Sequence, residues 1–275
     1  MENQWELDRQ NDRIVAYLPS MEKGELMEIF TRFKTESLGK LIIFSLERDS
    51  KGLSELGFQF EAEMSGFFQG KKACIFSYYG NERRSASKTA SENKEVMALV
   101  QMDSKDLSNL IITNFSVELV GDTEWNDLAE LFEIVFPVYP TDIYDPNYLR
   151  KAGEQNYTFI VAKNEAGKII GAASAMESGY GSAEITDCAV HPDYRGNQVL
   201  YGIILALEKE LIKKGIYHAY SITRAKSVGM NLTVKRLGYV YEGTLTNNCV
   251  ISTGFEDMNV WTKKLEKEPK KEPKL

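Results

Sequence analysis

Two hydrophobic periods alternate along the second part of the chain. Short apolar or alternating runs predict strands, whereas apolar positions three and four residues apart predict helices. The strands are expected at residues 115–120, 157–162, 169–176, 184–190, 218–222, 239–245 and 258–263. The helices are expected at residues 123–135, 198–214 and 228–237. This order of strands and helices is typical of an α/β or α+β sheet protein.

The N-terminal region repeats part of this pattern. Residues 40–46 and 74–79 predict apolar strands, and residues 50–56 predict a helix. The segment 56–64 begins with Leu-Gly-aromatic, as does the segment 237–245, and an aromatic-rich strand follows each. The region is therefore predicted to resemble the C-terminal half of the same fold, and chance similarity of two strand starts is the alternative.

Composition excludes several classes of protein. The 275 residues are 43% hydrophobic and 27% charged, which is ordinary for a globular chain, and no apolar run approaches the about 20 residues that cross a bilayer. The net charge of −7 disfavours nucleic acid as a partner. The polar N-terminus is unlike a secretory signal, and three widely spaced cysteines fit free thiols in a reducing cytoplasm. Two histidines and no paired cysteines predict no metal site.

The junction at residues 183–197 is the most informative segment. An apolar strand ends at a His-Pro pair, the turn Arg195-Gly196 follows, and an amphipathic helix begins near Gln198. The first N–H groups of a helix have no internal partner and lie at its positive end, so this junction suits an anion. The wording VHPDYRG resembles the acyl-CoA pyrophosphate loop of the GNAT superfamily of N-acetyltransferases. The element order over residues 115–265 also matches the GNAT fold, a mixed sheet flanked by helices.

This resemblance implies an acetyl-CoA site at the junction. Arg195 and Gly196 fit the common pattern Arg/Gln-x-x-Gly-x-Gly/Ala, whereas Gln198 and Leu200 stand where small residues are usual. Because the donors are backbone amides, side chains that point outward are tolerated. An ordinary strand–turn–helix junction is the alternative. The residues expected to bind acetyl-CoA are Ala189, Val190, Arg195, Gly196, Asn197, Gln198, Val199, Leu200 and Ser227.

The strand 184–190 carries the candidate chemistry. In GNAT folds this strand has a bulge, and the acetyl group and pantetheine pair with its freed backbone, which we assign to Ala189 and Val190. Glu184 and Asp187 are candidate bases for the proton of an ammonium substrate. Their offset of three places them on opposite faces of a regular strand, but a bulge between them would bring them to one side. An ammonium anchor or a solvated strand residue is the alternative role for each.

The resemblance also shows a departure from the family pattern. Many GNAT enzymes have a Tyr in the second-to-last helix that protonates the leaving thiolate, and Val234 occupies that position here. The usual Asn near the start of that helix falls on Ser227. Tyr201, Tyr239 or water would have to replace the Tyr, or the thiolate leaves unassisted.

Two segments are candidates for binding the acceptor. Residues 136–146 combine aromatic rings with acids, and Tyr139, Asp142 and Tyr144 suit an ammonium group through cation–π contacts and charge pairing. A proline-rigid loop that opens the next helix at Asp145-Pro146 is the alternative. Residues 246–261 are rich in amides and acids, which suit the carboxylate and amine of an amino acid, and Asn248 is their candidate ligand. A polar hairpin loop is the alternative there.

A narrower resemblance rests on three stretches. FPVYPTDIYDPNYL, SVGMNLTVKRLGY and NNCVIS with EDMNVWTK together look like the bacterial and archaeal β-lysine N-acetyltransferases. The resemblance implies acetylation of the ε-amine of β-lysine, directly from acetyl-CoA, to give the compatible solute Nε-acetyl-β-lysine used in osmoprotection. A GNAT enzyme for another small amine or polyamine and a non-catalytic acyl-CoA sensor are the alternatives. An acetyl intermediate on Cys188 is a minor one, since no His partner is apparent.

We divide the chain into three parts. Residues 1–110 form an N-terminal structural region, a candidate degenerate half-GNAT, residues 111–265 form the catalytic GNAT domain, and residues 266–275 form a charged, proline-broken disordered tail. The N-terminal region has no Arg-Gly turn, and its apolar strands would aggregate if they were exposed. We therefore expect it to pack on the catalytic sheet or to form a homodimer interface.

Overall fold

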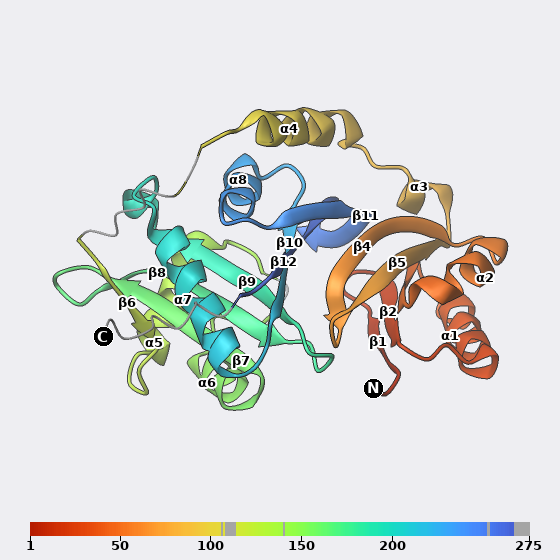
Figure 1. The fold of residues 1–275 in the computed structure, drawn as a ribbon, viewed down its shortest axis with the longest axis horizontal. Helices are drawn as coiled ribbons and strands as arrows, with labels where there is room; N and C mark the ends of the chain where they lie inside the picture. Colours follow the sequence, from red (N-terminus) through yellow and green to blue (C-terminus); the bar gives the residue numbers. More distant parts are fainter. Residues whose placement is uncertain (106, 108–113, 140, 252–253, 267–275) are drawn as a thin grey trace, which may run out of the picture.

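One mixed 12-stranded sheet runs through both ends of the chain (Figure 1). The computed structural model describes residues 1–105, 107, 114–139, 141–251 and 254–266. The strands are β1 (Gln4–Asp8), β2 (Arg13–Leu18), β3 (Lys40–Ser45), β4 (Gln59–Phe68), β5 (Lys71–Tyr79), β6 (Ser116–Leu119), β7 (Tyr157–Lys163), β8 (Ile169–Glu177), β9 (Ala183–Val190), β10 (His218–Arg224), β11 (Val240–Ile251) and β12 (Gly254–Lys264). Their order across the sheet is β1-β2-β3-β5-β4-β11-β12-β10-β9-β8-β7-β6. We call residues 1–105 the N-terminal half and the described part of 114–266 the C-terminal half.

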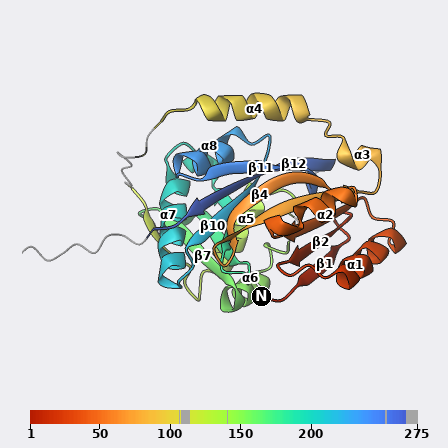
Figure 2. The same ribbon diagram turned by 45° about the vertical axis from the view of Figure 1, so that its right-hand side comes forward.

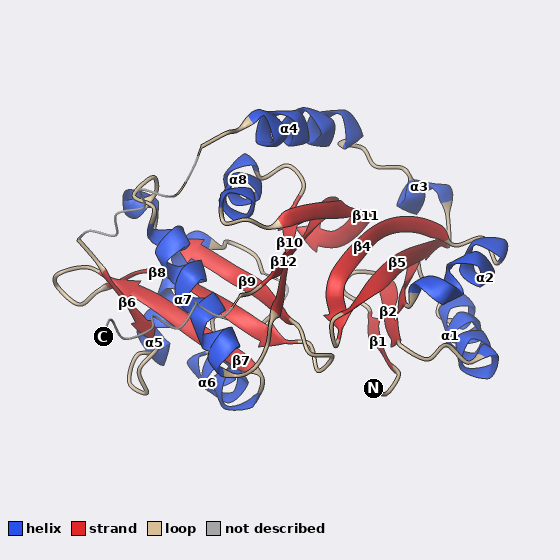
Figure 3. Ribbon diagram, viewed as in Figure 1, coloured by secondary structure: helices blue, strands red, loops and turns tan. Residues whose placement is uncertain are grey.

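Helices cover the sheet in both halves (Figure 3). They are α1 (Lys23–Thr35), α2 (Ser50–Glu55), α3 (Glu82–Ser85), α4 (Ala90–Met102), α5 (Trp125–Val135), α6 (Pro146–Gln155), α7 (Val199–Lys213) and α8 (Val228–Arg236), with short 3-10 turns η1 (Glu47–Asp49) and η2 (Pro192–Tyr194). Apolar residues of α1 and α2 pack on the N-terminal strands. In the C-terminal half, α7 and α8 cover one face of the sheet, and α5 and α6 cover the other. Both faces of the sheet in the C-terminal half are therefore covered by helices.

The helix α4 connects the two halves. It spans from the side of α3 to the side of α8 in both views (Figures 1 and 2). The ammonium group of Lys235 on α8 donates to the backbone oxygens of Val100, Gln101 and Asp103 at 2.6, 3.0 and 2.6 Å. The last carbonyls of a helix have no internal partner, so this one side chain caps α4 and holds it against α8.

The two halves share one topology. In each, two parallel strands joined by a helix are followed by a second helix and an antiparallel hairpin, in the sheet orders β2-β3-β5-β4 and β9-β10-β12-β11. Both Leu-Gly-aromatic strands also shift register at the same place, between Phe60 and Ala62 in β4 and between Tyr241 and Gly243 in β11. The similarity of the segments 56–64 and 237–245 thus corresponds to a repeated structure. That the N-terminal region is a degenerate half of a GNAT domain stays a prediction.

The repeated strands meet each other where the halves join. Ala62 of β4 pairs with Gly243 of β11, and these two residues occupy equivalent positions in the repeat. A side chain on Gly243 would collide with the backbone oxygen of Glu61 at 2.4 Å, so only glycine permits this approach. The flanking contacts are reciprocal, because Glu61 accepts from the Thr246 N–H and Glu242 accepts from the Ser65 N–H, both at 2.7 Å. The halves are therefore related by a local pseudo-twofold axis.

An apolar cluster is shared by the two halves. It contains Val15, Ile42, Phe44, Ala62, Met64, Phe67, Phe68, Ala73 and Ile75 from the N-terminal half and Tyr180, Tyr220, Leu245, Met258 and Val260 from the C-terminal half. The N-terminal half thus packs on and extends the sheet of the C-terminal half. This agrees with the expectation that the N-terminal region packs on the catalytic sheet.

The fold class and the predicted strands and helices are confirmed, with shifted ends. The largest shift is in β11, which extends to Ile251 rather than 245. Sequence analysis did not predict β1, β2 and α1, and it had α6 only as the alternative to a binding loop. The proposed boundary near residue 110 and all but the first residue of the predicted tail 266–275 lie outside the described residues.

Candidate functional site

A β-bulge interrupts β9 where it pairs with β8. Thr186 pairs with Ser174 and Ala189 pairs with Ala172, so three steps on β9 match two on β8. The extra residue gives Asp187 a left-handed backbone with φ +50°. The bulge expected in this strand is thus confirmed. Residues 185 and 189 would point to the same face of a regular strand. Because of the bulge, Ile185 packs with α7 on one face and Ala189 packs with α5 on the other.

The same strand separates from β10. The parallel pairing of β9 with β10 is restricted to Ala183 and Glu184. Beyond them, the Ser221 hydroxyl donates to the Ile185 oxygen at 2.9 Å. The backbone edge from residue 186 to Val190 therefore has no strand partner on the β10 side within the described chain. A linear ligand with amide groups can pair with such an edge, and the predicted contacts Ala189 and Val190 lie on it.

The turn after β9 leads into an open helix end. Gly196 has φ +81° and Gln198 has φ +61°, and Gln198 begins α7 without a side-chain cap. The first turn of α7 contains no acidic residue. Residues Arg195, Gly196, Asn197 and Gln198 are exposed, so an anion can approach the first backbone amides of α7.

The remaining predicted cofactor residues have different roles. Val199 is buried and packs on β8, where a side chain on Gly171 would meet its Cγ1 at 2.8 Å; Leu200 is partly buried. Both can therefore offer their backbone amides. Ser227 caps α8, because its hydroxyl oxygen accepts from the Met230 N–H at 3.4 Å. These features fit the pyrophosphate and pantetheine of acyl-CoA.

Asp187 is held by two hydroxyl groups. Its side chain accepts from the Tyr139 hydroxyl at 2.7 Å and from the Ser174 hydroxyl, and the residue is 6% exposed. Burial raises the pKa of this carboxyl, while the hydroxyl donors of Ser174 and Tyr139 oppose the rise. Two fixed donors make Asp187 a well-ordered carboxylate.

Glu184 is the second acid of this strand. Burial, followed by the charge of Asp187, raises the pKa of Glu184 to about 8, with smaller opposing effects from Arg13 and the Tyr220 hydroxyl. Both carboxylates also raise the pKa of Tyr157, which burial raises most. Because Ile185 packs on the α7 face, its neighbour Glu184 points to the opposite face, and Asp187 meets Tyr139 and Ser174 on that same face. The bulge thus brings the two acids to one side of the strand, which is the second of the two arrangements considered from the sequence.

Comparison with known proteins identifies the family. Residues 125–239 match the acetyltransferase (GNAT) family. The chain is 34% identical over 92% of its length to the N-acetyltransferase YodP of Bacillus subtilis, of which the alignment covers 92%. This chain is a GNAT N-acetyltransferase.

Two further relatives carry a more specific name. This chain is 30% identical to the beta-lysine N(6)-acetyltransferase of Methanococcus maripaludis, over 92% of this chain and 93% of that protein. It is 28% identical to the protein of that name from Methanosarcina mazei, over 84% of this chain and 93% of that protein. GNAT acetyltransferases use acetyl-CoA as the acetyl donor.

Tyrosine side chains from both halves surround the two acids. Tyr17 of β2 lies 5.6 Å from Tyr180, ring to ring, and Tyr220 lies 5.6 Å from Phe67. After burial, carboxylate charge is the next cause that raises the pKa of Tyr157 and Tyr220. Sequence analysis missed Tyr17, Tyr157 and Tyr220; the only signal was their place in alternating strands.

The structure separates the predicted acceptor residues. Tyr139 reaches Asp187, whereas the Tyr144 hydroxyl donates to the Phe136 oxygen at 2.7 Å and closes the loop onto itself. Asp142 is exposed in this loop. Asn248 lies on β11, 3% exposed, where its backbone oxygen accepts from Arg13. The acceptor residues therefore do not form a single cluster in the acetyltransferase.

The structure shows the contacts of the residues considered as proton donors to the departing thiolate, and of Cys188, the candidate for covalent catalysis. Val234 is fully buried in the α7–α8 core. The Tyr201 hydroxyl accepts from Arg236 at 3.2 Å, and the buried Tyr239 hydroxyl has no hydrogen-bond partner among the described residues. Burial, with the charges of Asp187 and Glu184, strongly raises the pKa of Cys188, and its thiol contacts the Thr186 oxygen at 3.6 Å. Cys188 therefore stays a thiol, which disfavours an acetyl intermediate on it.

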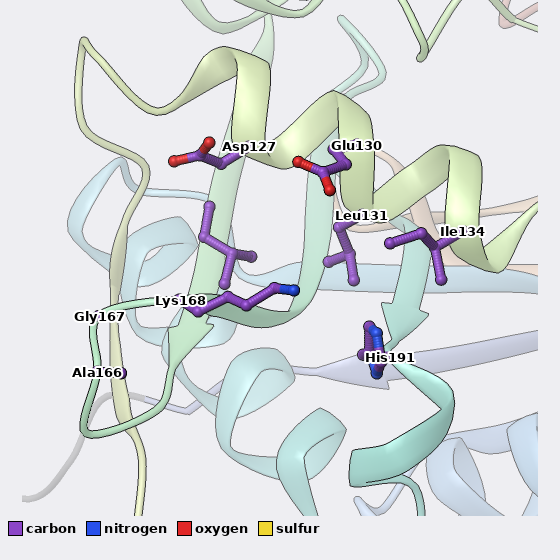
Figure 4. Close-up of a pocket in the computed structure, with 9 residues that line it drawn as sticks. Asp127, Glu130, Leu131, Ile134, Ala166, Gly167, Lys168 and His191 are labelled. Carbon is purple, nitrogen blue, oxygen red and sulfur yellow. The ribbon is translucent and has the colours of Figure 1, made fainter.

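A separate cavity of about 330 Å³ lies beside the turn (Figure 4). It is formed by Asp127 and Glu130 of α5, the β7–β8 turn around Lys168, and His191. Neither Glu184 nor Asp187 lines it. Among the described residues, no group of three or more His, Cys, Asp or Glu side chains is placed to hold a metal ion, and no helix is long and apolar enough to span a membrane.

Proposed function

We propose that this enzyme transfers the acetyl group of acetyl-CoA to the ε-amine of β-lysine and so produces Nε-acetyl-β-lysine as a compatible solute. The observation that carries the proposal is the pair of acids at the bulge of β9, next to the strand edge that β10 leaves unpaired. The names of two relatives that align over most of this chain support β-lysine as the acceptor. Rings and carboxylates around the pair suit a cationic amine.

Acetyl-CoA, when bound, supplies an acetyl thioester. Ala189 and Val190 would offer backbone groups to its acetyl and pantetheine parts, and the amides from Gly196 to Leu200 would hold its pyrophosphate. Backbone N–H groups fixed at the bulge are suited to polarise a carbonyl, because they need no reorganisation as negative charge develops. Arg195 adds a cation beside the turn, and its Nε lies 3.4 Å from the Val190 oxygen.

Glu184 is the proposed general base. An amine reaches the enzyme as an ammonium and must lose a proton before it attacks, and a base works best when its pKa is near the working pH. The raised pKa of about 8 gives Glu184 this property. Asp187 already accepts from Tyr139 and Ser174, so we assign it to hold the acceptor ammonium and to raise the pKa of Glu184.

The proposal requires no metal ion and no nucleic-acid or membrane partner, and it places the enzyme in the cytoplasm. Free thiols at Cys74, Cys188 and Cys249 are compatible with a reducing compartment. Since the edge of β11 that faces β4 is already paired within the chain, a homodimer would use another surface.

An amine panel tests the proposal. Purified enzyme with acetyl-CoA is offered β-lysine, lysine, ornithine and spermidine, and the release of the CoA thiol is measured. We expect the highest kcat/KM with β-lysine. A higher value with spermidine would identify a polyamine enzyme instead. Calorimetric binding of acetyl-CoA without turnover of any amine would identify a sensor.

A further inference from the structure

We propose that Arg13, on β2 of the N-terminal half, binds the carboxylate of the amino-acid acceptor and that Asn248 completes this head-group site. The inference deepens the proposed function and rests on it. It gives the N-terminal half a part in substrate selection, in addition to the structural role expected from the sequence.

The Arg13 guanidinium is held by two of its three nitrogens. Its Nε pairs with the Asp8 Oδ2 at 2.8 Å, and its Nη1 donates to the Asn248 backbone oxygen at 2.9 Å and lies 3.7 Å from the Cys249 sulfur. No hydrogen bond of Nη2 is found within the described chain. The side chain is 14% exposed, so it is largely desolvated. A rigid guanidinium with a free N–H edge is suited to a carboxylate.

Asn248 adds a polar group without a partner. The residue is 3% exposed, and its side-chain oxygen is buried without a hydrogen bond among the described residues. A buried acceptor without a donor is costly unless a ligand supplies one. The amino group next to the acceptor's carboxylate is a donor of the required kind.

The N-terminal half holds this part of β11 in an irregular conformation. The pairing of β11 with β12 shifts between Leu245 and Cys249, and Asn247 has φ +46°. The Val250 N–H donates to the Asn11 side chain at 2.7 Å, and the Lys40 ammonium donates to the Thr246 oxygen at 2.7 Å. The head-group site is therefore built by contacts between the halves.

Arg13 faces the space that contains the acids. Val15, two residues along β2, packs in the cluster shared with Tyr220, and Tyr17, two residues further, contacts Tyr180. Tyr220 is the register partner of Glu184. Side chains two apart on a strand point to one face, so Arg13 lies on the face directed at Glu184. The Arg13 charge also lowers the pKa of Glu184, which agrees with this placement.

The charges then match the two ends of a diamino acid. The acids Glu184 and Asp187 attract the amine that is to be acetylated, and Arg13 attracts the carboxylate at the other end. A diamine without a carboxylate would leave the Nη2 edge of the largely buried Arg13 without an acceptor. The arrangement thus selects amino acids over plain diamines.

The test compares β-lysine with 1,4-diaminopentane, which is the same molecule without its carboxyl group. In Arg13→Gln we expect kcat/KM for β-lysine to fall about 10- to 100-fold, through KM, because a hydrogen bond to a charged group is lost. The value for 1,4-diaminopentane should change by less than about threefold on the same scale. Arg13→Lys keeps the charge but not the fork and should fall in between. Arg9→Gln is the matched control, because Arg9 pairs with Glu36 at the surface and should affect neither amine.

Since Arg13 also pairs with Asp8, a second variant keeps it in place. Asn248→Asp sets a carboxylate beside Arg13 that pairs with it, and the preference for β-lysine should fall as in Arg13→Gln. Thermal melting and acetyl-CoA binding confirm that each variant is folded. A folded Asn248→Asp or Arg13→Gln enzyme with the wild-type preference would overturn the inference, as would a wild type that prefers the diamine. Failure of the proposed function is a separate result, in which the wild type acetylates neither amine.

Discussion

The regions β2–β5 and β9–β12 have the same topology but differ in their parallel strand pairs. β2 and β3 pair without a break from Arg13 and Lys40 to Leu18 and Ser45, whereas β9 and β10 pair only at Ala183 and Glu184. A fully paired strand offers no backbone groups to a ligand, and an unpaired edge does. The topology therefore does not make the site; the departure of β9 from its neighbour does.

The equivalent positions also differ in chemistry. Following the strand pairing outward from Ala62 and Gly243 places Val15 at the position of Glu184, and Ile42 at that of Tyr220. Where the C-terminal half has an acid with a raised pKa, the N-terminal half has an aliphatic side chain in the shared cluster. The N-terminal half thus has the packing of the repeat without its acid.

Separating the halves should have the largest effect. A fragment of residues 110–275 loses β4 beside β11 and exposes Leu245, Met258 and Val260 of the shared cluster. Burial of such side chains contributes about 1.5–3 kcal/mol each, so we expect an insoluble or inactive fragment. Expression, gel filtration and kcat/KM measure this. A soluble monomer with native kcat/KM would contradict both the packing role and the Arg13 site.

Removal of the acid should come next. Glu184→Gln keeps the shape of the side chain but cannot accept a proton, and we expect kcat to fall about 10²- to 10⁴-fold. Asp187→Asn should act mainly on KM for the amine, because Asp187 is assigned to binding. Steady-state kinetics of both variants decide the assignment. If both keep near-full kcat, the base lies elsewhere.

The turn after β9 differs from the start of α1 in the other half, where Gly24 already lies inside the helix. In Gly196→Glu a side chain is forced into φ +81° and a negative charge faces the pyrophosphate, so KM for acetyl-CoA should rise at least about tenfold. Gly24→Glu is the control, since it adds the same charge in the first turn of α1, where nothing lies within 4 Å of a Cβ. Equal acetyl-CoA affinities in the two variants would refute the cofactor site.

The pH dependence should follow the same acid. The base must be ionised, so kcat/KM for the amine should rise about tenfold per pH unit below the Glu184 pKa of about 8 and bend there. The stability trend has the opposite sign: the folded enzyme keeps the proton above the unfolded pKa, so stability falls as pH rises toward 8. Glu184→Gln should show no bend in its pH profile. Its melting temperature should exceed that of the wild type by more at pH 8 than at pH 5. A bend that persists in this variant would assign the titration to another group.

Local sequence patterns predicted the elements of the C-terminal half well. Apolar strand residues and turns that contain glycine indicate the strands β7, β8 and β9 and the antiparallel pairing of neighbours along the chain. The bulge was expected from the family resemblance, whereas the unusual backbone of Asp187 has no local sequence signal. Arg13 and Tyr17 were missed for a physical reason. The run Arg13–Leu18 is short and apolar, and its approach to the acids depends on the curvature of a sheet in which β2 and β9 are not neighbours. Such a contact is encoded by the whole sheet rather than by the segment.

The pseudo-twofold pair Glu61 and Glu242 gives the most direct comparison of the two halves, because it affects stability rather than the reaction. Glu61 is buried and pairs with Lys40, which is fully buried, whereas Glu242 meets Ser65 near the surface. Glu61→Gln leaves a buried cation uncompensated and should cost about 3–5 kcal/mol of unfolding free energy, and Glu242→Gln about 1 kcal/mol or less. Burial already lowers the pKa of Lys40 to about 8, so the unfolded chain binds more protons and stability rises with pH above that value. Urea unfolding of Glu61→Gln should therefore show a smaller loss at pH 9 than at pH 7. Equal losses in the two variants would mean that the halves contribute alike to their junction.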